Sequence, residues 1–471
     1  MKTTTLLSAI LSAVALHAAT VDQVIVRQQW PWSTDVKVEY RITGVTSPVD
    51  ISVVAYDGDT PLDSSNLAAA MKGDLFGIAK DRFGSFTIDP VKAFGKGEIA
   101  VMNFNVRLTS TASAANMTNV LYKVVDLDTG AVTDITRADF YGNKYGTFET
   151  NFSAVGAGFT TSLEDVLIWT EVTNNPIYKT DKLVMRKIPA AAWGPWTLGA
   201  GGSNGSSDPS SLNGDGHLVQ LTSDYYIGVF PITQAQCKKI WGTYGVLYTN
   251  AADYADHLYK PATGIQWWKL RSLSSRTDST TEDPESASFC GILNARPEFA
   301  AAGLKFDLPT EAQWEFAARG GTMDNVLYSG ATWSGASIHT LAWNSENILK
   351  TQTTITSGNA GYDVGQTVAV GRKPPNAFGL YDTLGNAYEH CRDYTDDAAY
   401  SYSETPDVDP KGVSRDSAAN GSGSSSNYKK HIARGGSIDK TRTYSTVRSR
   451  FSFHENAQPA AGLRVICTVA E

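Results

Sequence analysis

The sequence contains four cysteines, the residue type with the most direct use in redox and metal chemistry. No two of them are close enough in sequence for a zinc knuckle or for the C-x-x-C pair of thiol–disulfide enzymes. In an oxidising compartment they can form at most two disulfides, and four cysteines allow three connectivities, among which the count does not choose. The cysteines are Cys237, Cys290, Cys391 and Cys467.

The histidines are scattered, and no His-x-x-x-His spacing places two of them on one helix face. An iron site of two histidines and a carboxylate would therefore have to be assembled by the fold. Histidines spread in this way are most often solvated or held by hydrogen bonds. Those beyond the N-terminal leader are His217, His257, His339, His390, His431 and His454.

The composition is that of a folded protein without a nucleic-acid partner. Hydrophobic residues make up 42% of the 471 residues and charged residues 19%, with a net charge of −8. No basic block occurs, whereas binding to phosphate backbones or anionic membranes needs clustered positive charge. At about 150 residues per domain, the length predicts two or three domains.

The N-terminus resembles a secretory signal peptide. Met1-Lys2 gives a short positive start, the apolar run Leu6–Leu16 follows, and Ala18-Ala19 offers a cleavage site. The run is shorter than the roughly 20 apolar residues that span a bilayer. We therefore expect residues 1–19 to be a cleaved signal, the mature protein to be secreted or periplasmic, and no membrane span.

In residues 20–172, apolar and polar residues alternate at 36–42 and 102–108, a period typical of strands with one buried face. Further strand-like runs lie at 51–56, 121–127 and 131–135. The last two are joined by Asp128-Thr129-Gly130, a hairpin-type turn. A helix is expected at Leu67–Lys72, ended by Gly73. The pattern predicts an all-β sandwich of immunoglobulin or fibronectin type.

Residues 173–181 form a polar stretch that predicts a linker. Residues 182–471 differ in composition from the preceding region, with many Trp and Gly residues and short polar loops. Two loops, 199–216 and 414–427, are rich in Gly and Ser. Three short helices are expected. The first is Cys237–Trp241, which follows the capping box of Thr233 and Gln236, and the second is Glu285–Asn294. The third begins at the capping box of Thr310 and Gln313 and ends at Gly320.

Several blocks of this second region resemble the sulfatase-modifying factor family, whose best-known member is the formylglycine-generating enzyme. They occur in the family's order, and together they are far more specific than any one of them alone. The blocks are Tyr226–Thr233, Trp267, Leu308–Gly321, Pro375–Glu389, Arg434–Ser437 and Gly462–Arg464. The resemblance implies an α+β fold related to C-type lectins for residues 182–471.

The family's oxidase converts a cysteine in a sulfatase peptide of Cys-x-Pro-x-Arg type to formylglycine, using oxygen and a copper ion held by two thiolates. The positions that match these two thiolates here are Lys440 and Ser445. Neither side chain can replace a soft thiolate as a ligand of Cu(I). Copper is therefore not expected, and no catalytic or cofactor-binding residue is assigned.

A calcium site of the family matches this sequence better. The resemblance implies that calcium is held by the side chains of Asp382 and Glu389 and by the backbone carbonyls of Gly385 and Ala387. Calcium prefers several hard oxygen ligands, and two carboxylates across a Gly-Asn turn can converge on one ion. The resemblance also makes a Cys290–Cys467 disulfide plausible, because Cys467 lies two residues from the family's closing cysteine position.

Three functions are compatible with these observations. The first is a secreted binding module for protein or glycan that lacks the oxidase centre, since lectin-like scaffolds hold irregular loops on a rigid core. The second is an active formylglycine-generating oxidase, and the third is a non-haem iron oxidoreductase on the same fold. Family membership alone does not decide among them, and the missing thiols favour the first.

Overall fold

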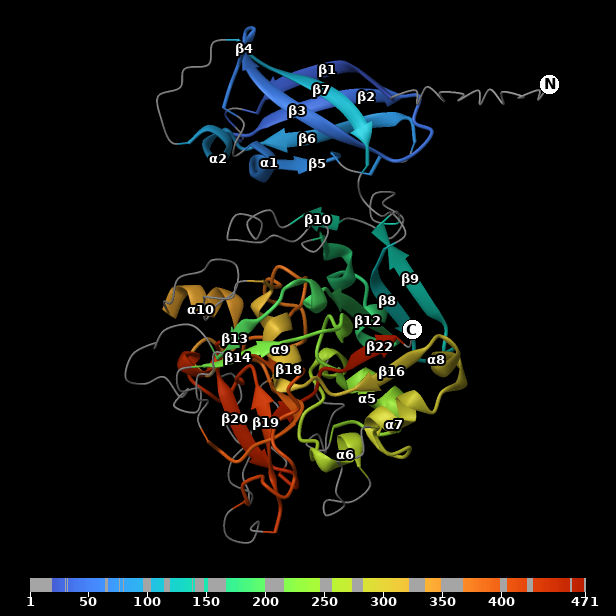
Figure 1. The fold of residues 1–471 in the computed structure, drawn as a ribbon, viewed down its shortest axis with the longest axis vertical. Helices are drawn as coiled ribbons and strands as arrows, with labels where there is room; N and C mark the ends of the chain where they lie inside the picture. The colour runs from blue at the N-terminus through green and yellow to red at the C-terminus, as the bar shows by residue number, and fades with distance from the viewer. Residues whose placement is uncertain are drawn as a thin grey trace, which may run out of the picture. The chain divides into compact units, whose positions relative to one another are not determined.

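The computed structural model describes two compact units, Met1–Thr118 and Asn119–Glu471, and each is considered by itself (Figure 1). The expected signal peptide and most of the 199–216 loop lie outside the described residues. These are 19–29, 31, 33–63, 67–75, 77–78, 80–95, 103–113, 119–137, 139, 148–150, 167–199, 216–245, 256–272, 283–321, 335–348, 367–398, 405–421, 427–457 and 460–469. Within these ranges no helix is long and apolar enough to cross a membrane.

The first unit consists of two antiparallel sheets that share one apolar core. One sheet has the order β1-β2-β6-β5 and the other β4-β3-β7. The strands are β1 Thr20–Gln28, β2 Val36–Thr43, β3 Val49–Asp57, β4 Thr60–Pro61, β5 Met71–Gly73, β6 Arg82–Ile88 and β7 Phe104–Ala112, with helices α1 Leu67–Ala70 and α2 Pro90–Phe94. Val38 and Phe86 of the first sheet lie in the same cluster as Ile51 and Val106 of the second. The predicted β-rich N-terminal region is confirmed, and its immunoglobulin type stays a prediction.

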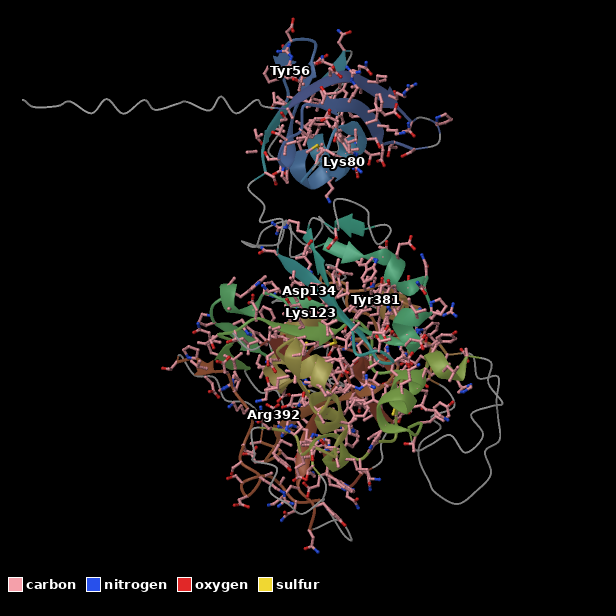
Figure 2. All side chains as sticks on the ribbon, turned by 90° about the vertical axis from the view of Figure 1, so that its right-hand side faces the viewer. Tyr56, Lys80, Lys123, Asp134, Tyr381 and Arg392 are labelled. Atoms are coloured by element: carbon pink, nitrogen blue, oxygen red, sulfur yellow. The ribbon has the colours of Figure 1, made fainter. Side chains whose placement is uncertain are left out.

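The predicted domain boundary is wrong. Two strands that the sequence pattern predicts in the N-terminal sandwich belong to the second unit. They are β8 Val120–Asp126 and β9 Val132–Thr136. β8 pairs antiparallel with β12 (Lys182–Ile188), in the register Lys182↔Asp126 to Arg186↔Tyr122. A buried-face pattern identifies a strand but says nothing about which sheet receives it. The hairpin itself is confirmed, and Lys123 and Asp134 pair across it at 2.7 Å (Figure 2).

The predicted linker is also wrong, because residues 173–181 are part of the second unit. Helix α4 (Ile177–Thr180) occupies this stretch, after the 3₁₀ turn η3 (Thr170–Thr173). The carbonyl of Lys179 accepts a hydrogen bond of 2.6 Å from the hydroxyl of Thr233, and the Lys179 side chain is buried. The stretch is therefore packed into the second unit through Lys179, although residues 174–176 are exposed.

The described residues of the second unit form four sheets. Their orders are β16-β22-β15-β12-β8-β9, β20-β19-β17-β21, β13-β14-β18 and β10-β11. The strands not yet bounded are β10 Phe148–Thr150, β11 Leu167–Trp169, β13 Trp196–Leu198, β14 His217–Gln220, β15 Tyr225–Gly228, β16 Leu304–Asp307, β17 Tyr388–Tyr394, β18 Asp407–Val408, β19 Lys430–Arg434, β20 Arg450–His454, β21 Ala461–Gly462 and β22 Ile466–Val469. Because β22 lies between β15 and β16, segments far apart in sequence close the six-stranded sheet.

Short helices surround these sheets. They are α5 Gln234–Trp241, α6 Trp268–Arg271, α7 Phe289–Asn294, α8 Pro297–Ala301, α9 Glu311–Arg319 and α10 Gly335–Leu341, with 3₁₀ turns η4 Ala190–Ala192, η7 His257–Tyr259 and η10 Arg442–Tyr444. Both predicted capping boxes are present, at Thr233 and at Thr310. α7 begins later than predicted because Ser288 is its N-cap and accepts from the amide of Gly291.

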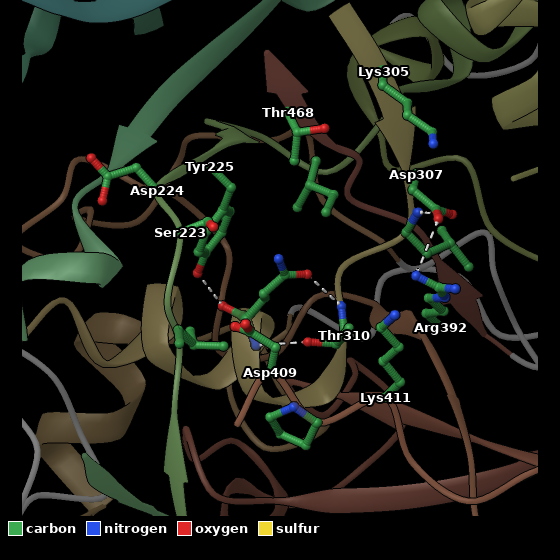
Figure 3. Close-up of a pocket in the computed structure, with 15 residues that line it drawn as sticks. Ser223, Asp224, Tyr225, Lys305, Asp307, Thr310, Arg392, Asp409, Lys411 and Thr468 are labelled. Carbon is green, nitrogen blue, oxygen red and sulfur yellow. Dashed lines mark hydrogen bonds and ion pairs between the residues drawn. The ribbon is translucent and has the colours of Figure 1, made fainter. Parts of the chain in front are cut away.

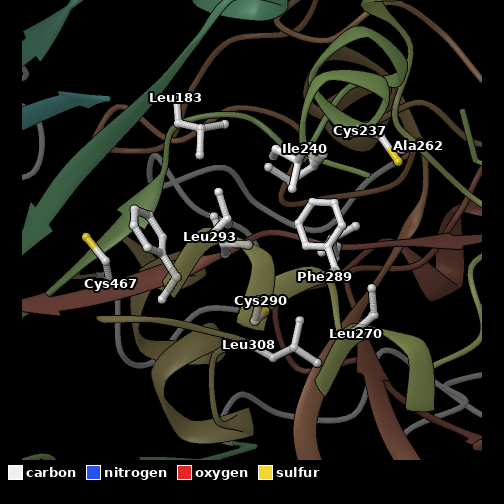
Figure 4. Close-up of a cluster of buried hydrophobic side chains, with 14 of the residues drawn as sticks. Leu183, Cys237, Ile240, Ala262, Leu270, Phe289, Cys290, Leu293, Leu308 and Cys467 are labelled. Atoms are coloured by element: carbon white, nitrogen blue, oxygen red, sulfur yellow. The ribbon is translucent and has the colours of Figure 1, made fainter. Parts of the chain in front are cut away.

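The cysteines are buried as free thiols in the apolar interior. Cys237, Cys290 and Cys467 belong to one cluster with Phe289 and Leu293, and Figure 4 shows Cys290 on α7 apart from Cys467 on β22. The plausible Cys290–Cys467 bridge is therefore not formed in this structure. Each sulfur packs among apolar side chains, and burial raises the pKa of the Cys467 thiol to about 12.

Candidate functional site

The segment after the Gly-Gly-Ser motif holds the two positions where the resemblance places the copper ligands. The Lys440 side chain is half-buried and its ammonium lies 3.4 Å from the carboxylate of Asp439. The Lys440 carbonyl accepts a hydrogen bond of 2.9 Å from the amide of Ser345. Ser445 is fully buried, and its hydroxyl oxygen has no hydrogen-bond partner among the described residues. A cation and a buried hydroxyl therefore stand where thiolates are required.

Two glycines give this segment its path. Gly435 and Gly436 have φ values of +90° and +76°, a region that disfavours residues with a Cβ. A Cβ added to Gly436 would lie 2.4 Å from the carbonyl oxygen of Tyr444. The close approach lets η10 fold back over the motif, where Arg442 pairs with Glu346 at 2.7 Å. The Gly-Gly pair is thus a structural requirement of the loop.

Three of the four predicted calcium ligands, Asp382, Gly385 and Ala387, precede β17, and Glu389 is the second residue of that strand. Asp382 is buried, and its carboxylate accepts hydrogen bonds from the Gly371 amide (2.7 Å) and the Asn386 amide group (3.3 Å). Within the described residues it forms no ion pair. Burial, with a smaller contribution from the charge of Glu389, raises the pKa of Asp382 to about 6. Asp382 is therefore a buried acid without a direct ion pair among the described residues, and the charges of Arg464, Lys179 and Lys373 act on it from further away.

Glu389 is in a different situation. Its carboxylate accepts hydrogen bonds from Arg464 at 2.7 and 2.9 Å and from the indole of Trp314 at 2.6 Å. Arg464 also donates to the backbone carbonyls of Gly228 and Tyr381. The Gly385 carbonyl accepts a hydrogen bond of 2.8 Å from the Ala387 amide. A hard cation at this turn would therefore use the Asp382 carboxylate, share the Gly385 carbonyl with the Ala387 amide and share the Glu389 oxygens with Arg464.

A second group of buried charges fixes α9 to the β19–β20 hairpin. Glu311 accepts from Arg450 at 2.9 Å, and Arg434 lies 3.6 Å from it. Glu315 pairs with Arg319 at 2.6 Å and also contacts Arg434. All five side chains are buried. Since each charge has partners, these residues of the Leu308–Gly321 block hold the fold together and are not poised for chemistry.

Asp393 lies beside this network and differs from its acids in its protonation state. Asp393 and Glu311 line a cavity of about 330 Å³, together with His217 and Asp407. The Asp393 carboxylate accepts from the Glu311 amide at 2.8 Å. Burial, together with the neighbouring charge of Glu311, raises the pKa of Asp393 to about 8. At neutral pH Asp393 is therefore largely a protonated acid that can donate a hydrogen bond into the cavity. Sequence reasoning missed this residue because its neighbour Glu311 is brought close only by the fold.

The histidines do not assemble a metal site. In the part of the chain that the structure describes, no three His, Cys, Asp or Glu side chains are close enough to hold one ion. His390 and His431 are the exception to the scatter, since both are fully buried with ring centroids 4.9 Å apart. Burial lowers the pKa of His390 to about 4, and burial together with the neighbouring His390 lowers the pKa of His431 well below its ordinary value, so both are neutral at pH 7. The two histidines and a carboxylate that iron would need are not brought together there.

Comparison with known proteins identifies the family to which the chain belongs. The profile described as "Sulfatase-modifying factor enzyme 1-like domain" matches residues 194–469 of the 471. The chain therefore belongs to the sulfatase-modifying factor family. The match covers all the motif blocks, the turn with Asp382 and Glu389, and the segment with Lys440 and Ser445. It does not include the N-terminal unit.

Relatives in this family include the formylglycine-generating enzyme of Bos taurus, 37% identical over 238 residues, which are 44% of this chain and 59% of that protein. The enzyme of Mus musculus is 27% identical over 215 residues, 40% of this chain and 55% of that protein. The chaperone protein LppX of Paenibacillus barcinonensis is 26% identical over 208 residues, 39% of this chain and 66% of that protein. The chain thus spans less than two thirds of the length of these relatives.

Among solved structures, variable protein 1 of Treponema denticola is similar to 61% of this chain and 95% of its own, with 22% identity and a TM-score of 0.40. PvdO from Pseudomonas aeruginosa covers the same shares, with 18% identity and a TM-score of 0.38. These scores are too low to establish a common fold, so the lectin-like fold of this sulfatase-modifying factor domain stays a prediction.

Proposed function

We propose that the sulfatase-modifying factor domain of this chain is a non-oxidase recognition module for a protein or glycan. The carrying observation is the pair Lys440 and Ser445, which stands where the family's oxidase would need two thiolates. Lys440 contributes a cation, and Ser445 a hydroxyl that is fully buried. Soft Cu(I) requires thiolate or imidazole ligands, and a cationic ammonium repels it.

The remaining cysteines offer no substitute for the missing pair. Cys391 lies on β17, and burial raises the pKa of its thiol well above the ordinary value. Cys237, Cys290 and Cys467 are in the apolar cluster of Figure 4. A metal-binding thiol must be deprotonated, and buried thiols with raised pKa values resist that.

The test is an oxidase assay on the full chain. Purified protein is incubated with copper, oxygen and a Cys-x-Pro-x-Arg peptide, and mass spectrometry follows the conversion of the peptide thiol. The expected result is no turnover. Formylglycine formation that disappears in the Cys391→Ala variant would overturn the proposal and support the oxidase alternative. Turnover that requires added iron would support the iron alternative instead.

We also propose that the domain binds structural calcium at the turn of Asp382. Asp382 would supply a carboxylate oxygen, Gly385 and Ala387 backbone carbonyls, and Glu389 a second carboxylate shared with Arg464. The support is the buried Asp382 carboxylate, which has no direct ion pair among the described residues, and the set of oxygen ligands that calcium prefers. Elemental analysis of the protein purified without chelator tests this, and the absence of bound calcium would contradict it.

Export is proposed on the leader sequence of residues 1–19, which supports a secreted or periplasmic location. N-terminal sequencing of the protein recovered from an exporting host tests it. A mature chain that still begins at Met1 would contradict the proposal.

A further inference from the structure

A hollow of about 250 Å³ lies away from the calcium turn, between the six-stranded sheet, the start of α9 and residues 409–411 (Figure 3). Its apolar wall includes Leu221, Leu308 and Ile466. Charged side chains enter it from several elements. Figure 3 shows Asp224 and Asp409 on one side and Lys305, Arg392 and Lys411 on the other.

Arg392 of β17 is the cation with the least compensation. Its side chain is 20% exposed, and its nearest acid is Asp307, 3.9 Å away. Within the described residues its guanidinium donates no hydrogen bond. Asp307 is already occupied, since it accepts from Arg271 at 2.6 and 3.0 Å and from the Leu308 amide at 2.7 Å. A guanidinium carries five N–H donors, so the Arg392 fork has unused donors at the wall of the hollow.

The acids around the hollow do not neutralise Arg392, because each has partners of its own. Asp224 pairs with Lys187 at 3.1 Å. Asp409 accepts from the Thr222 amide at 2.9 Å and from its hydroxyl. Lys305, in contrast, pairs with Asp283 in a surface contact whose side chains are 55% and 67% exposed. Such surface pairs are weak, so the Lys305 ammonium can turn toward a ligand at little cost.

We propose that this hollow binds a small ligand through an anionic group, a carboxylate or a sulfate, with Arg392 as the principal residue. A planar guanidinium binds either group by donating two parallel N–H···O hydrogen bonds. Lys305 supplies a second positive charge, and Leu221 and Ile466 cover the apolar part of the ligand. This deepens the proposed recognition function and rests on it, because it names the class of chemical group that the domain recognises.

The experiment uses the full chain and three aromatic probes of similar size: benzoate, phenyl sulfate and benzylamine. Binding is measured by ligand-observed NMR and calorimetry in a chloride buffer free of sulfate and phosphate. We expect at least one anion to bind and benzylamine not to bind. Benzoate alone would identify the ligand group as a carboxylate, and phenyl sulfate alone as a sulfate.

The variants test the residue. Arg392→Gln should weaken anion binding at least about tenfold, as expected for loss of a charge-assisted bidentate pair. Arg392→Lys should recover part of it, since an ammonium keeps the charge but not the fork. Arg442→Gln is the matched control, because it removes a guanidinium that pairs with Glu346 elsewhere and should leave binding unchanged. Lys305→Met, at an exposed position, is a second test should Arg392→Gln unfold, with a smaller loss expected.

Two outcomes would overturn the inference. The first is that neither anion binds the unmodified chain, and the second is that the folded Arg392→Gln variant binds the anions as tightly as the unmodified chain does. Should the Arg392 variant unfold, unchanged binding by Lys305→Met overturns it. The oxidase assay is independent of Arg392. Formylglycine production would overturn the proposed function, whereas a chain without oxidase activity that also ignores the anions would overturn this inference alone.

Discussion

The substitution Asp382→Asn tests the buried turn most directly, because its stabilising effect in chelator should be lost in calcium. Without a cation, the ionised Asp382 carboxylate is a cost to the folded state. Its pKa of about 6 in the fold lies above the ordinary 3.8. For an acid with a raised folded pKa, the folded state holds the proton more tightly, so stability falls as pH rises from about 4 to 6 and then stays level.

The magnitude follows from the shift. A difference of about two pKa units at roughly 1.36 kcal/mol each corresponds to about 3 kcal/mol at pH 7. In a chelator, Asp382→Asn removes this cost and should raise the free energy of unfolding by up to that amount, less the hydrogen bonds that asparagine makes poorly. With calcium at a hundredfold excess over its Kd, the unmodified domain gains about 2.7 kcal/mol and the variant does not. The variant should then lose its advantage.

The assay is thermal and urea unfolding of both proteins at pH 7.5, each in chelator and in calcium. Glu389→Gln is the comparison variant, because it strands the buried Arg464 guanidinium and should destabilise by about 3–5 kcal/mol in chelator. In calcium its loss should be larger, since a proposed ligand of the ion is also removed. An effect of Asp382→Asn that is equal in chelator and calcium would refute the calcium assignment. A destabilisation of similar size in both would also refute the interpretation that the ionised Asp382 carboxylate destabilises the folded state.

Three further outcomes are expected. His390 is neutral in the fold, with a pKa of about 4. As pH falls through about 6.5, the unfolded chain therefore takes up a proton at His390 before the folded chain does, and the free energy of unfolding declines. Urea unfolding should show that His390 accounts for a loss of about 2 kcal/mol at pH 5, and this contribution should be absent in His390→Phe. Gly436→Ala should cost at least about 2 kcal/mol, since a Cβ would lie 2.4 Å from the Tyr444 carbonyl at a φ of +76°; a melting curve like that of the unmodified chain would contradict this. In denaturant without reductant all four thiols should react with a thiol reagent, as free cysteines do; protection of Cys290 and Cys467 until reduction would instead establish the bridge.

Local elements followed from the sequence because their causes are local. The capping boxes at Thr233 and Thr310 each join residues three apart, and both formed as predicted. The β8–β9 hairpin likewise depends on one short turn. The family assignment came from motif blocks whose residues are now seen to be structural, such as Arg464, which binds Glu389 and three backbone carbonyls.

The sequence by itself determined the family, the strands and caps, and the lack of thiolates at Lys440 and Ser445, because these depend on residue identity and short spacing. Only the tertiary structure decided that β8 pairs with β12 and so moved the domain boundary, because strand pairing is a long-range choice. It likewise decided that Glu389 pairs directly with Arg464 whereas Asp382 has no direct ion pair among the described residues, that Asp393 meets Glu311, and that Arg392 faces a hollow. Each of these depends on burial and on neighbours that lie tens of residues away in the chain.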